Sequence, residues 1–187
     1  AQLAPQRDPG SAEVKAQFEK ESGYTVEVTN FDATSTYAVV ATDGSVTMSG
    51  STVTVTGLTP GAGSLVTVTT SHVGYTDASA AQSGLALLAG ITPALGAPTR
   101  TADGFTFELT NLDPDATYAL VATAGSVTLS GSTVTVTGLA YGAASTVTVT
   151  SSRTGYTDAS AAQSGNALLA GIAPELGTPT RTADGYT

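Results

Sequence analysis

The residues that could do chemistry in this chain are few and widely separated. The single histidine, His72, lies in the segment SHVG, and the residue 81 positions later is Arg153. A serine nucleophile would need a histidine in contact with it and a carboxylate that orients the imidazole ring. The chain has no cysteine, which excludes a thiolate nucleophile, a disulfide framework and a thiolate metal site. These residue types predict a protein that is not an enzyme.

Two carboxylates in one predicted loop form the candidate metal site. The segment LDPDAT places Asp113 and Asp115 two residues apart. Loop carboxylates at this spacing can share a hard cation, and calcium is the cofactor that they would suit. The corresponding segment FDATST has only Asp32 of the pair. Aspartates in turns also cap backbone amides, so the sequence leaves a calcium site and a capping role both open.

A repeat of 81 residues organises the chain. Gly23, Gly104 and Gly185 occupy the same place in three copies of one pattern, and about three quarters of the paired positions in the first two copies are identical. We expect the chain to be a fragment of a longer array of domains. The predicted boundaries are an N-terminal extension at 1–9, repeats at 10–90 and 91–171, and the first strand of a truncated third repeat at 172–187.

Within each repeat, apolar residues alternate with polar ones, which is typical of half-buried strands. In the second repeat Phe105, Phe107 and Leu109 alternate with polar residues, and in the first the segment VKAQFEKE at 14–21 predicts an opening strand with Phe18 on its apolar face. Turn-forming segments separate six or seven such strands in each repeat. The sequence therefore predicts an all-β fold of two tandem antiparallel immunoglobulin-like β-sandwiches.

A family resemblance supports this fold. The stretch STVTVTGLTPGAGSLVTVTTSHVGYTDASA at 51–80 resembles the second half of a fibronectin type III domain, with the Gly-Leu-x-Pro-Gly turn at 57–61. The wider pattern, from PTRTADGFTFELTN to RTGYTDASA, is similar to tandem repeats of bacterial surface and secreted proteins and of some phage virion proteins. The chain departs from the family in having no tryptophan, and Ser64 and Ser145 replace the tyrosine expected after the Pro-Gly turn. The resemblance thus implies an array of sandwiches with a different core.

Charge and hydropathy limit the partners of such an array. Lys and Arg number 6 against 15 Asp and Glu, giving a formal net charge of -9, which disfavours nucleic acids and anionic membrane surfaces. No run of residues approaches the roughly 18 apolar positions of a membrane span. Together with the resemblance, the composition predicts a structural spacer or stalk of a bacterial extracellular or cell-surface protein. The alternatives are an adhesion or carbohydrate-binding module and a decoration or fibre protein of a virion.

Three further features predict contacts rather than chemistry. The segment LALLAGITP at 85–93 would join the two repeats, with Leu87, Leu88, Ile91 and Pro93 packing at the joint. Tyr141 is the one loop aromatic, and so the candidate residue for a surface glycan or a protein ligand. The strand after residue 172 would have no sandwich to complete, which predicts self-association through pairing with another chain.

Overall fold

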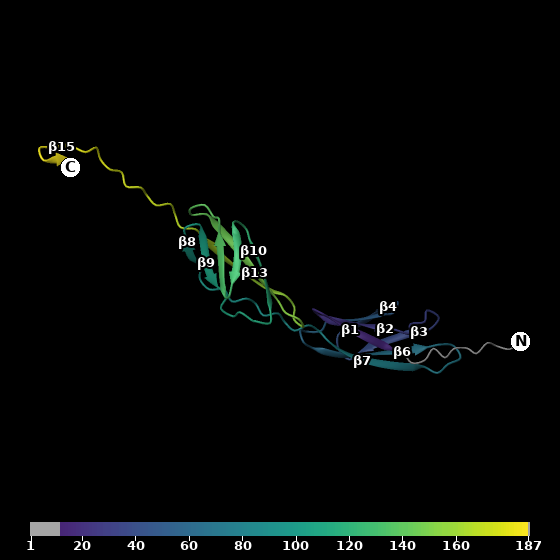
Figure 1. Ribbon diagram of the computed structural model, residues 1–187. Coiled ribbons are helices and arrows are strands. Elements are labelled where there is room, and N and C mark those ends of the chain that lie inside the picture. The colour runs from purple at the N-terminus through teal and green to yellow at the C-terminus, as the bar shows by residue number, and fades with distance from the viewer. Residues whose placement is uncertain (1–11, 187) are drawn as a thin grey trace. The chain divides into compact units, whose positions relative to one another are not determined.

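The structure is a computed structural model that describes residues 12–186 (Figure 1). All the regular elements of these residues are β-strands. The first seven strands are β1 (Val14–Lys20), β2 (Gly23–Val28), β3 (Thr36–Ala41), β4 (Ser45–Ser49), β5 (Thr52–Thr56), β6 (Gly63–Ser71) and β7 (Ala78–Leu85). Within this part of the chain no helix is present that is long and apolar enough to cross a membrane.

These seven strands form two antiparallel sheets with one core between them. One sheet has the order β1-β2-β5-β4 and the other β3-β6-β7. The core is built mainly from inward valines of β2, β5 and β6, among them Val26, Val55 and Val68, with Tyr24 and Leu58. Alternation along β5 and β6 places these valines inside and most of the threonines between them on the other face, although Thr70 near the end of β6 is buried. The arrangement is a β-sandwich, as the sequence predicts.

The second half of the chain repeats the strand pattern at the same spacing. Its strands are β8 (Thr99–Thr101), β9 (Gly104–Glu108), β10 (Thr117–Ala122), β11 (Ser126–Ser130), β12 (Thr133–Thr137), β13 (Ala144–Ser152) and β14 (Ala159–Asn166). Each strand from β10 to β14 begins and ends 81 positions after its counterpart between β3 and β7, as Thr117 does after Thr36. The sheet orders β8-β9-β12-β11 and β10-β13-β14 match those of the first half.

The chain forms two compact units. The first contains the described residues up to Thr92 together with Asp113–Tyr118 and Thr150–Ser160. The second contains Pro93–Leu112, Ala119–Val149 and the described residues from Ala161 onward. The loop before β10 and the turn between β13 and β14 therefore belong to the first unit, although the sequence repeat places them within 91–171.

A glycine in the last strand of each sandwich leaves room for the largest core side chain. A Cβ atom added to Gly84 in β7 would lie 2.4 Å from the ring of Tyr24, and one added to Gly165 in β14 would lie 2.5 Å from the ring of Phe105. Both rings are fully buried. This packing of an aromatic ring against a glycine fills a core that lacks tryptophan.

The opening strand differs from the alternation that its sequence predicts. The pairing of β1 with β2 shifts register between Lys15 and Gln17, which is a β-bulge. A one-residue shift moves every later side chain to the other face of a strand. Val14 therefore packs against the core, but Phe18 is 66% exposed. The prediction that Phe18 faces inward is wrong for this reason.

The end of the described chain forms a short hairpin instead of a single strand. Strands β15 (Arg181–Thr182) and β16 (Gly185–Tyr186) pair with Arg181 opposite Tyr186. The same register joins β8 and β9, where Arg100 lies opposite Phe105. The segment predicted as the first strand of a third repeat thus contains the equivalents of β8 and the start of β9, paired with each other.

Candidate functional site

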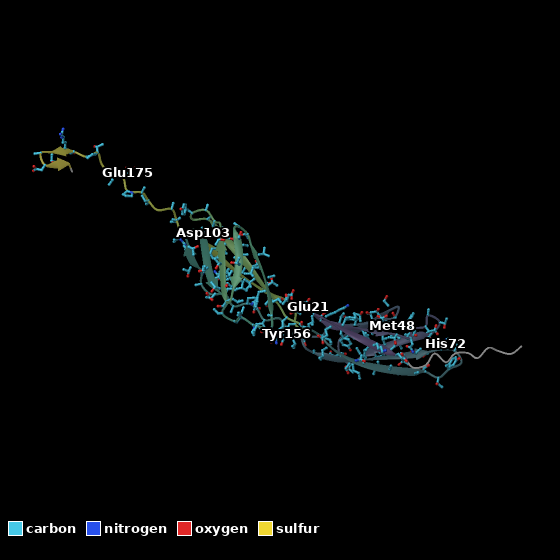
Figure 2. All side chains as sticks on the ribbon, in the orientation of Figure 1. Glu21, Met48, His72, Asp103, Tyr156 and Glu175 are labelled. Carbon is cyan, nitrogen blue, oxygen red and sulfur yellow. The ribbon has the colours of Figure 1, made fainter. Side chains whose placement is uncertain are left out.

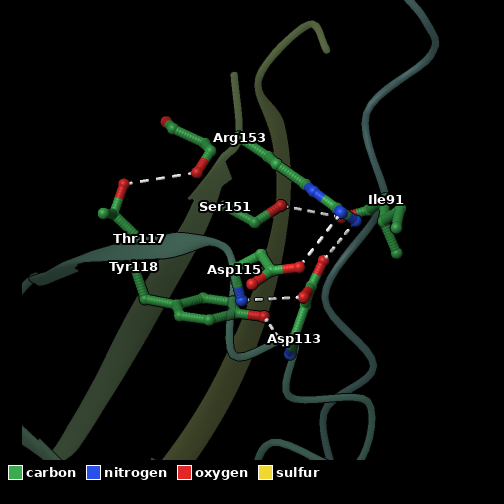
Figure 3. Close-up of polar contacts among 8 residues, drawn as sticks. Ile91, Asp113, Asp115, Thr117, Tyr118, Ser151 and Arg153 are labelled. Atoms are coloured by element: carbon green, nitrogen blue, oxygen red, sulfur yellow. Dashed lines mark hydrogen bonds and ion pairs between the residues drawn. The ribbon is translucent and has the colours of Figure 1, made fainter. Parts of the chain in front are cut away.

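The two carboxylates predicted as a metal site are bound to an arginine of the chain itself (Figure 3). Arg153 Nη1 lies 2.9 Å from Asp113 Oδ2, and Nη2 lies 3.2 Å from Asp115 Oδ2. Asp113 is the better covered partner, with its side chain 16% exposed against 72% for Asp115. The guanidinium group thus occupies the position between the carboxylates that a cation would take.

Local hydrogen bonds fix the loop that carries these carboxylates. The backbone amide of Asp115 donates to Asp113 Oδ1 at 2.9 Å, which is the capping role that turn aspartates favour. The amide of Asp113 donates to the hydroxyl of Tyr118 at 2.8 Å. Tyr118 at the start of β10 therefore also holds the loop in place. Arg153 also lies 5.1 Å from the ring centroid of Tyr156, a cation–π contact. The cluster is an ion pair network that ties the loop before β10 to the turn after β13.

The corresponding place in the first half has a different set of side chains. Asp32 accepts hydrogen bonds from the backbone amide and hydroxyl of Thr34 and from Ser35 Oγ. Ser35 Oγ also lies 3.2 Å from Nδ1 of His72, which stands in the turn after β6 (Figure 2). The hydrogen bonds from Thr34 lower the pKa of Asp32, and the charge of His72 lowers it further. Backbone amide and hydroxyl groups donate directly to Asp32, where the second half uses the guanidinium group of Arg153.

The order of these groups differs from that of a hydrolytic triad. A triad places the histidine between the carboxylate and the serine, so that the oriented imidazole removes the hydroxyl proton. Here Ser35 lies between Asp32 and His72, at 3.2 Å from each. Ser35 Oγ has one proton, and when it donates to Asp32, Nδ1 of His72 must be the donor to the serine. The geometry stabilises the loop and does not activate the serine as a nucleophile.

The calcium prediction for Asp113 and Asp115 stays a prediction, and the geometry makes it less favourable. Calcium takes six to eight oxygen ligands at about 2.3–2.6 Å. Among residues 12–186, no group of three or more histidine, aspartate or glutamate side chains is placed to hold a metal ion. A cation entering this loop would have to displace Arg153. Arg153 could not be assigned to these carboxylates from the sequence because it lies 38 positions after Asp115, although a basic or titratable residue stands at this turn in both halves.

The segment predicted as a joint makes backbone contacts that the sequence did not suggest. We call residues 86–92 the first connector and residues 153–157 the second turn, both of which belong to the first compact unit. The amide of Leu88 donates to the carbonyl of Gly155 at 2.9 Å, and the amide of Thr157 donates to the carbonyl of Leu88 at 2.9 Å. Leu88 and Tyr156 form a parallel β-bridge. The first connector therefore adds a short strand-like pairing to the second turn.

Two more hydrogen bonds extend this pairing along the first connector. The amide of Gly90 donates to Thr157 Oγ1 at 3.0 Å. The carbonyl of Ile91 accepts from Ser151 Oγ at 2.7 Å, as Figure 3 shows. Gly90 is sterically required, because a Cβ atom there would lie 2.1 Å from the carbonyl oxygen of Thr157. The contacts are mostly made by the backbone, which explains why leucine spacing alone could not predict them.

The four predicted joint residues have different surroundings. Leu87 makes backbone hydrogen bonds to Lys20 and Gly61 beside its own sandwich. Leu88 and Ile91 are 45% and 48% exposed. Pro93 is buried and belongs to the second compact unit. Tyr141, the candidate binding residue, lies in the loop between β12 and β13 and is 69% exposed.

A buried serine in each sandwich is a structural residue that the sequence analysis saw only as a departure from the family. Ser64 Oγ donates to the carbonyl of Asp43 and accepts from its amide, at 2.8 and 3.1 Å. Ser145 makes the same two bonds to Ala124, at 2.8 and 3.1 Å. In the first half the hydroxyl of Tyr24 also donates to the carbonyl of Ser64 at 2.7 Å. These serines tie the turn before β4 or β11 to the central strand of the other sheet.

Comparison with known proteins finds one kind of likeness. No family model matches the chain. No curated protein matches it either. Among solved structures it is similar to a chain titled "Central Fibronectin-III array of RIM-binding protein", with 12% identity and a TM-score of 0.32. The match covers 91% of this chain and 74% of that chain.

Proposed function

We propose that the chain is a non-enzymatic structural spacer, formed by two immunoglobulin-like, fibronectin type III-like sandwiches in series, from a repetitive bacterial extracellular or cell-surface protein. The observation that carries this proposal is the recurrence of the strand pattern at a spacing of 81 residues with no insertion, as from Thr36 in β3 to Thr117 in β10. Binding and catalytic functions usually add loops of differing length to a scaffold. The two copies add none between β3 and β7 or between β10 and β14.

The use of the polar residues supports the same proposal. The carboxylates of Asp113 and Asp115 neutralise Arg153, and Ser35 and His72 complete the hydrogen bonds of Asp32. Each of these groups holds a loop at one end of a sandwich in place. Side chains that bind one another in this way stabilise the fold, and few polar groups of these loops then remain to bind a substrate.

A spacer works because each sandwich has a core of its own. Length then increases with the number of copies, and stability is close to the sum of the separate domains and their nearest-neighbour contacts. The hydrogen bonds of Leu88, Gly90 and Ile91 would limit motion of the first connector. The net charge of -9 would keep neighbouring molecules apart.

The test is to vary the number of copies and measure the length. Chains that carry one, two, three or four copies of residues 91–171 would be compared by small-angle X-ray scattering. The nine residues of β6 span about 30 Å at roughly 3.3 Å per residue, so we expect the maximum dimension to grow by about this amount with each copy. A maximum dimension that stays constant beyond two copies would show that the copies collapse on one another and would refute the spacer function.

A further inference from the structure

An aspartate followed by a glycine occurs three times in the chain, and one of the three pairs stands in a different backbone setting. The pairs are at 43–44, 103–104 and 184–185. In the second and third pairs the glycine begins a strand and pairs with a threonine across a hairpin. The first pair instead lies in the connection between β3 and β4, which joins one sheet of the first sandwich to the other. Both of its residues are exposed, so water reaches the peptide bond between them.

The groups of this first pair that can react with each other are in contact. The amide nitrogen of Gly44 donates to Oδ1 of Asp43 at 2.8 Å, so the carboxyl carbon Cγ, one bond from Oδ1, is held beside this nitrogen. Gly44 adopts a positive φ of 76°, and a Cβ atom there would lie 2.5 Å from the carbonyl oxygen of Thr56. The turn therefore requires glycine, which has no side chain to shield its nitrogen. Holding a nucleophile against its electrophile is the arrangement that speeds a reaction within one molecule.

A buried hydroxyl acts on the same peptide group. Ser64 Oγ donates to the carbonyl oxygen of Asp43 at 2.8 Å, and Ser64 is only 6% exposed. This oxygen belongs to the same peptide group as the amide nitrogen of Gly44. When the nitrogen loses its proton, negative charge spreads onto the oxygen, where a fixed hydrogen-bond donor stabilises it. Ser64 thus favours the nucleophilic form of the amide.

The second sandwich has the same turn without the carboxylate. Gly125 also has a φ of 76°, and Ser145 makes the same two bonds to the residue before it, at 2.8 and 3.1 Å. That residue is Ala124, which stands 81 positions after Asp43. The turn therefore forms with either residue, and the carboxylate of Asp43 is not needed to build it.

We propose that Asp43 and Gly44 form a self-modification site, at which the first sandwich slowly acquires an isoaspartate. The amide nitrogen of Gly44 loses its proton and forms a bond to Cγ of Asp43. The C–O bond of the neutral carboxylic acid breaks, and its hydroxyl leaves with that proton as water, which gives a cyclic succinimide. Water then adds to the main-chain carbonyl carbon of Asp43 and breaks its bond to the nitrogen, so the chain continues through Cβ and Cγ. One water molecule leaves and one enters, so neither the composition nor the oxidation state changes.

The modification weakens the link between the two sheets of the first sandwich. It lengthens the main chain by one carbon between β3 and β4, and it converts the carbonyl that accepts from Ser64 into a carboxylate. The buried hydroxyl of Ser64 then loses the position of a partner that it now holds at 2.8 Å. Disturbing the partner of a buried polar group costs stability. We expect the melting temperature of the first sandwich to fall and that of the second to stay unchanged.

The first test follows the reaction in the folded full chain at mildly acidic pH, where the neutral carboxylic acid is available. The solvent is water enriched in the heavy oxygen isotope, which enters the protein when the succinimide opens. Peptide mapping by mass spectrometry should show heavy oxygen and isoaspartate accumulating at Asp43 about tenfold or more faster than at Asp103. In urea the two rates should become similar, because both aspartates then have only a following glycine in common.

Two substitutions exchange the site between the sandwiches. Asp43→Ala copies the second sandwich, so it should fold normally and abolish the modification of the turn. Ala124→Asp places a carboxylate beside Gly125 and Ser145, and we expect it to create a second site that reacts at a similar rate. Calorimetry of aged samples should show a lower melting temperature for the wild type, which Asp43→Ala prevents.

Three results would overturn the inference. Equal rates at Asp43 and Asp103 in the folded chain would show that the Asp-Gly sequence alone controls the reaction. A slower reaction of Asp43 in the folded chain than in urea would show that the turn protects it. An Ala124→Asp variant that stays unmodified at the new aspartate would show that the glycine and the buried serine of the turn do not promote the attack. None of these results bears on the growth of length with copy number, by which the spacer function is tested.

Discussion

At the level of single residues, the two sandwiches differ at the centre of their cores. Tyr24 and Phe105 hold equivalent places, and each ring lies against a glycine of the last strand. Only Tyr24 has a hydroxyl, which donates to the carbonyl of Ser64 at 2.7 Å. Burial raises the pKa of Tyr24, and its hydrogen bonds with Ser64 and Val66 oppose this effect. The first core therefore depends on a buried hydrogen bond that the second core does not have.

We predict that Tyr24→Phe lowers the free energy of unfolding by about 1 kcal/mol, the usual net contribution of one buried hydrogen bond. The raised pKa gives the sign of a second effect. Because the pKa of Tyr24 is raised by folding, the folded state favours the neutral phenol. The stability that this phenol contributes is fully present below the pKa of an unfolded tyrosine, about 10, and is lost as the pH rises through the higher pKa of the folded state. The variant should lose less stability than the wild type above pH 10. Urea denaturation at neutral and alkaline pH measures both effects.

The control for this prediction is Tyr141→Phe. Tyr141 is 69% exposed, so removing its hydroxyl should change the free energy of unfolding by less than about 0.5 kcal/mol. Equal effects of the two substitutions would show that the bond to Ser64 contributes nothing beyond the loss of a hydroxyl.

At the level of elements, the ends of each sandwich are held by contacts between one loop and one turn. In the second half Arg153 in the second turn joins Asp113 and Asp115 in the loop before β10. In the first half His72 and Ser35 make the equivalent link to Asp32. The first connector pairs with the second turn beside this ion pair network, so the position of the turn decides whether those backbone bonds form.

We predict that Arg153→Ala lowers the free energy of unfolding by about 1 kcal/mol. The pair with Asp113 is partly covered, with side-chain exposures of 34% and 16%, which places it near the upper end of the range for surface ion pairs. The variant should also increase hydrogen exchange at the amides of Leu88 and Thr157, because the second turn loses its anchor to the loop. Chemical denaturation and amide exchange by NMR measure the two effects.

Two other arginine variants show which property of Arg153 matters. Arg153→Lys keeps the charge but cannot contact both carboxylates with a planar fork, so we expect an intermediate loss. Arg100→Ala removes an exposed arginine of β8 and should change neither quantity. If Arg153→Ala leaves amide exchange as it is, the ion pairs do not position the turn.

The strands were largely predictable from the sequence, and the exceptions have physical reasons. Val134 and Val136 alternate with threonines, and a period of two shows directly which face is buried. The bulge before Phe18 leaves no mark on the alternation, so the reversal of faces could not be read from it. Strand β7 ends at Leu85, the first residue of the segment predicted as the joint, and its sequence ASAAQSGL has small residues on both faces and so gives little hydrophobic signal.

The candidate site was predictable only in part, because its partners are distant in the sequence. The spacing of Asp113 and Asp115 indicated a shared cation, but Arg153, which supplies the positive charge, could not be assigned to them without the fold. The contacts of Leu88 and Gly90 are made by the backbone, whose hydrogen bonds depend little on residue type. Buried Ser64 and Ser145 looked like polar exceptions to the core because their partners lie in a turn about 20 residues earlier.

At the level of the whole molecule, the charge is acidic and unevenly distributed. The formal net charge is -9 and the isoelectric point is about 4.2. The sheet-edge strands β3, β4, β10 and β11 contain no charged residue. Edge strands usually avoid pairing with other chains by means of local charges, prolines or bulges. On these four strands no local charge prevents pairing with another chain. We therefore expect the repulsion between negatively charged molecules to prevent it, and this repulsion depends on pH.

We predict that light scattering rises reversibly as the pH falls towards about 4.2, where the net charge vanishes. Lysines placed on two edge strands, by Thr47→Lys and Thr128→Lys, should suppress this scattering, because they prevent strand pairing directly. Two lysines in loops, Thr59→Lys and Ala140→Lys, change the net charge equally. They should only shift the pH of maximum scattering. Equal suppression by both pairs would mean that net charge alone controls association and that the uncharged edges have no part in it.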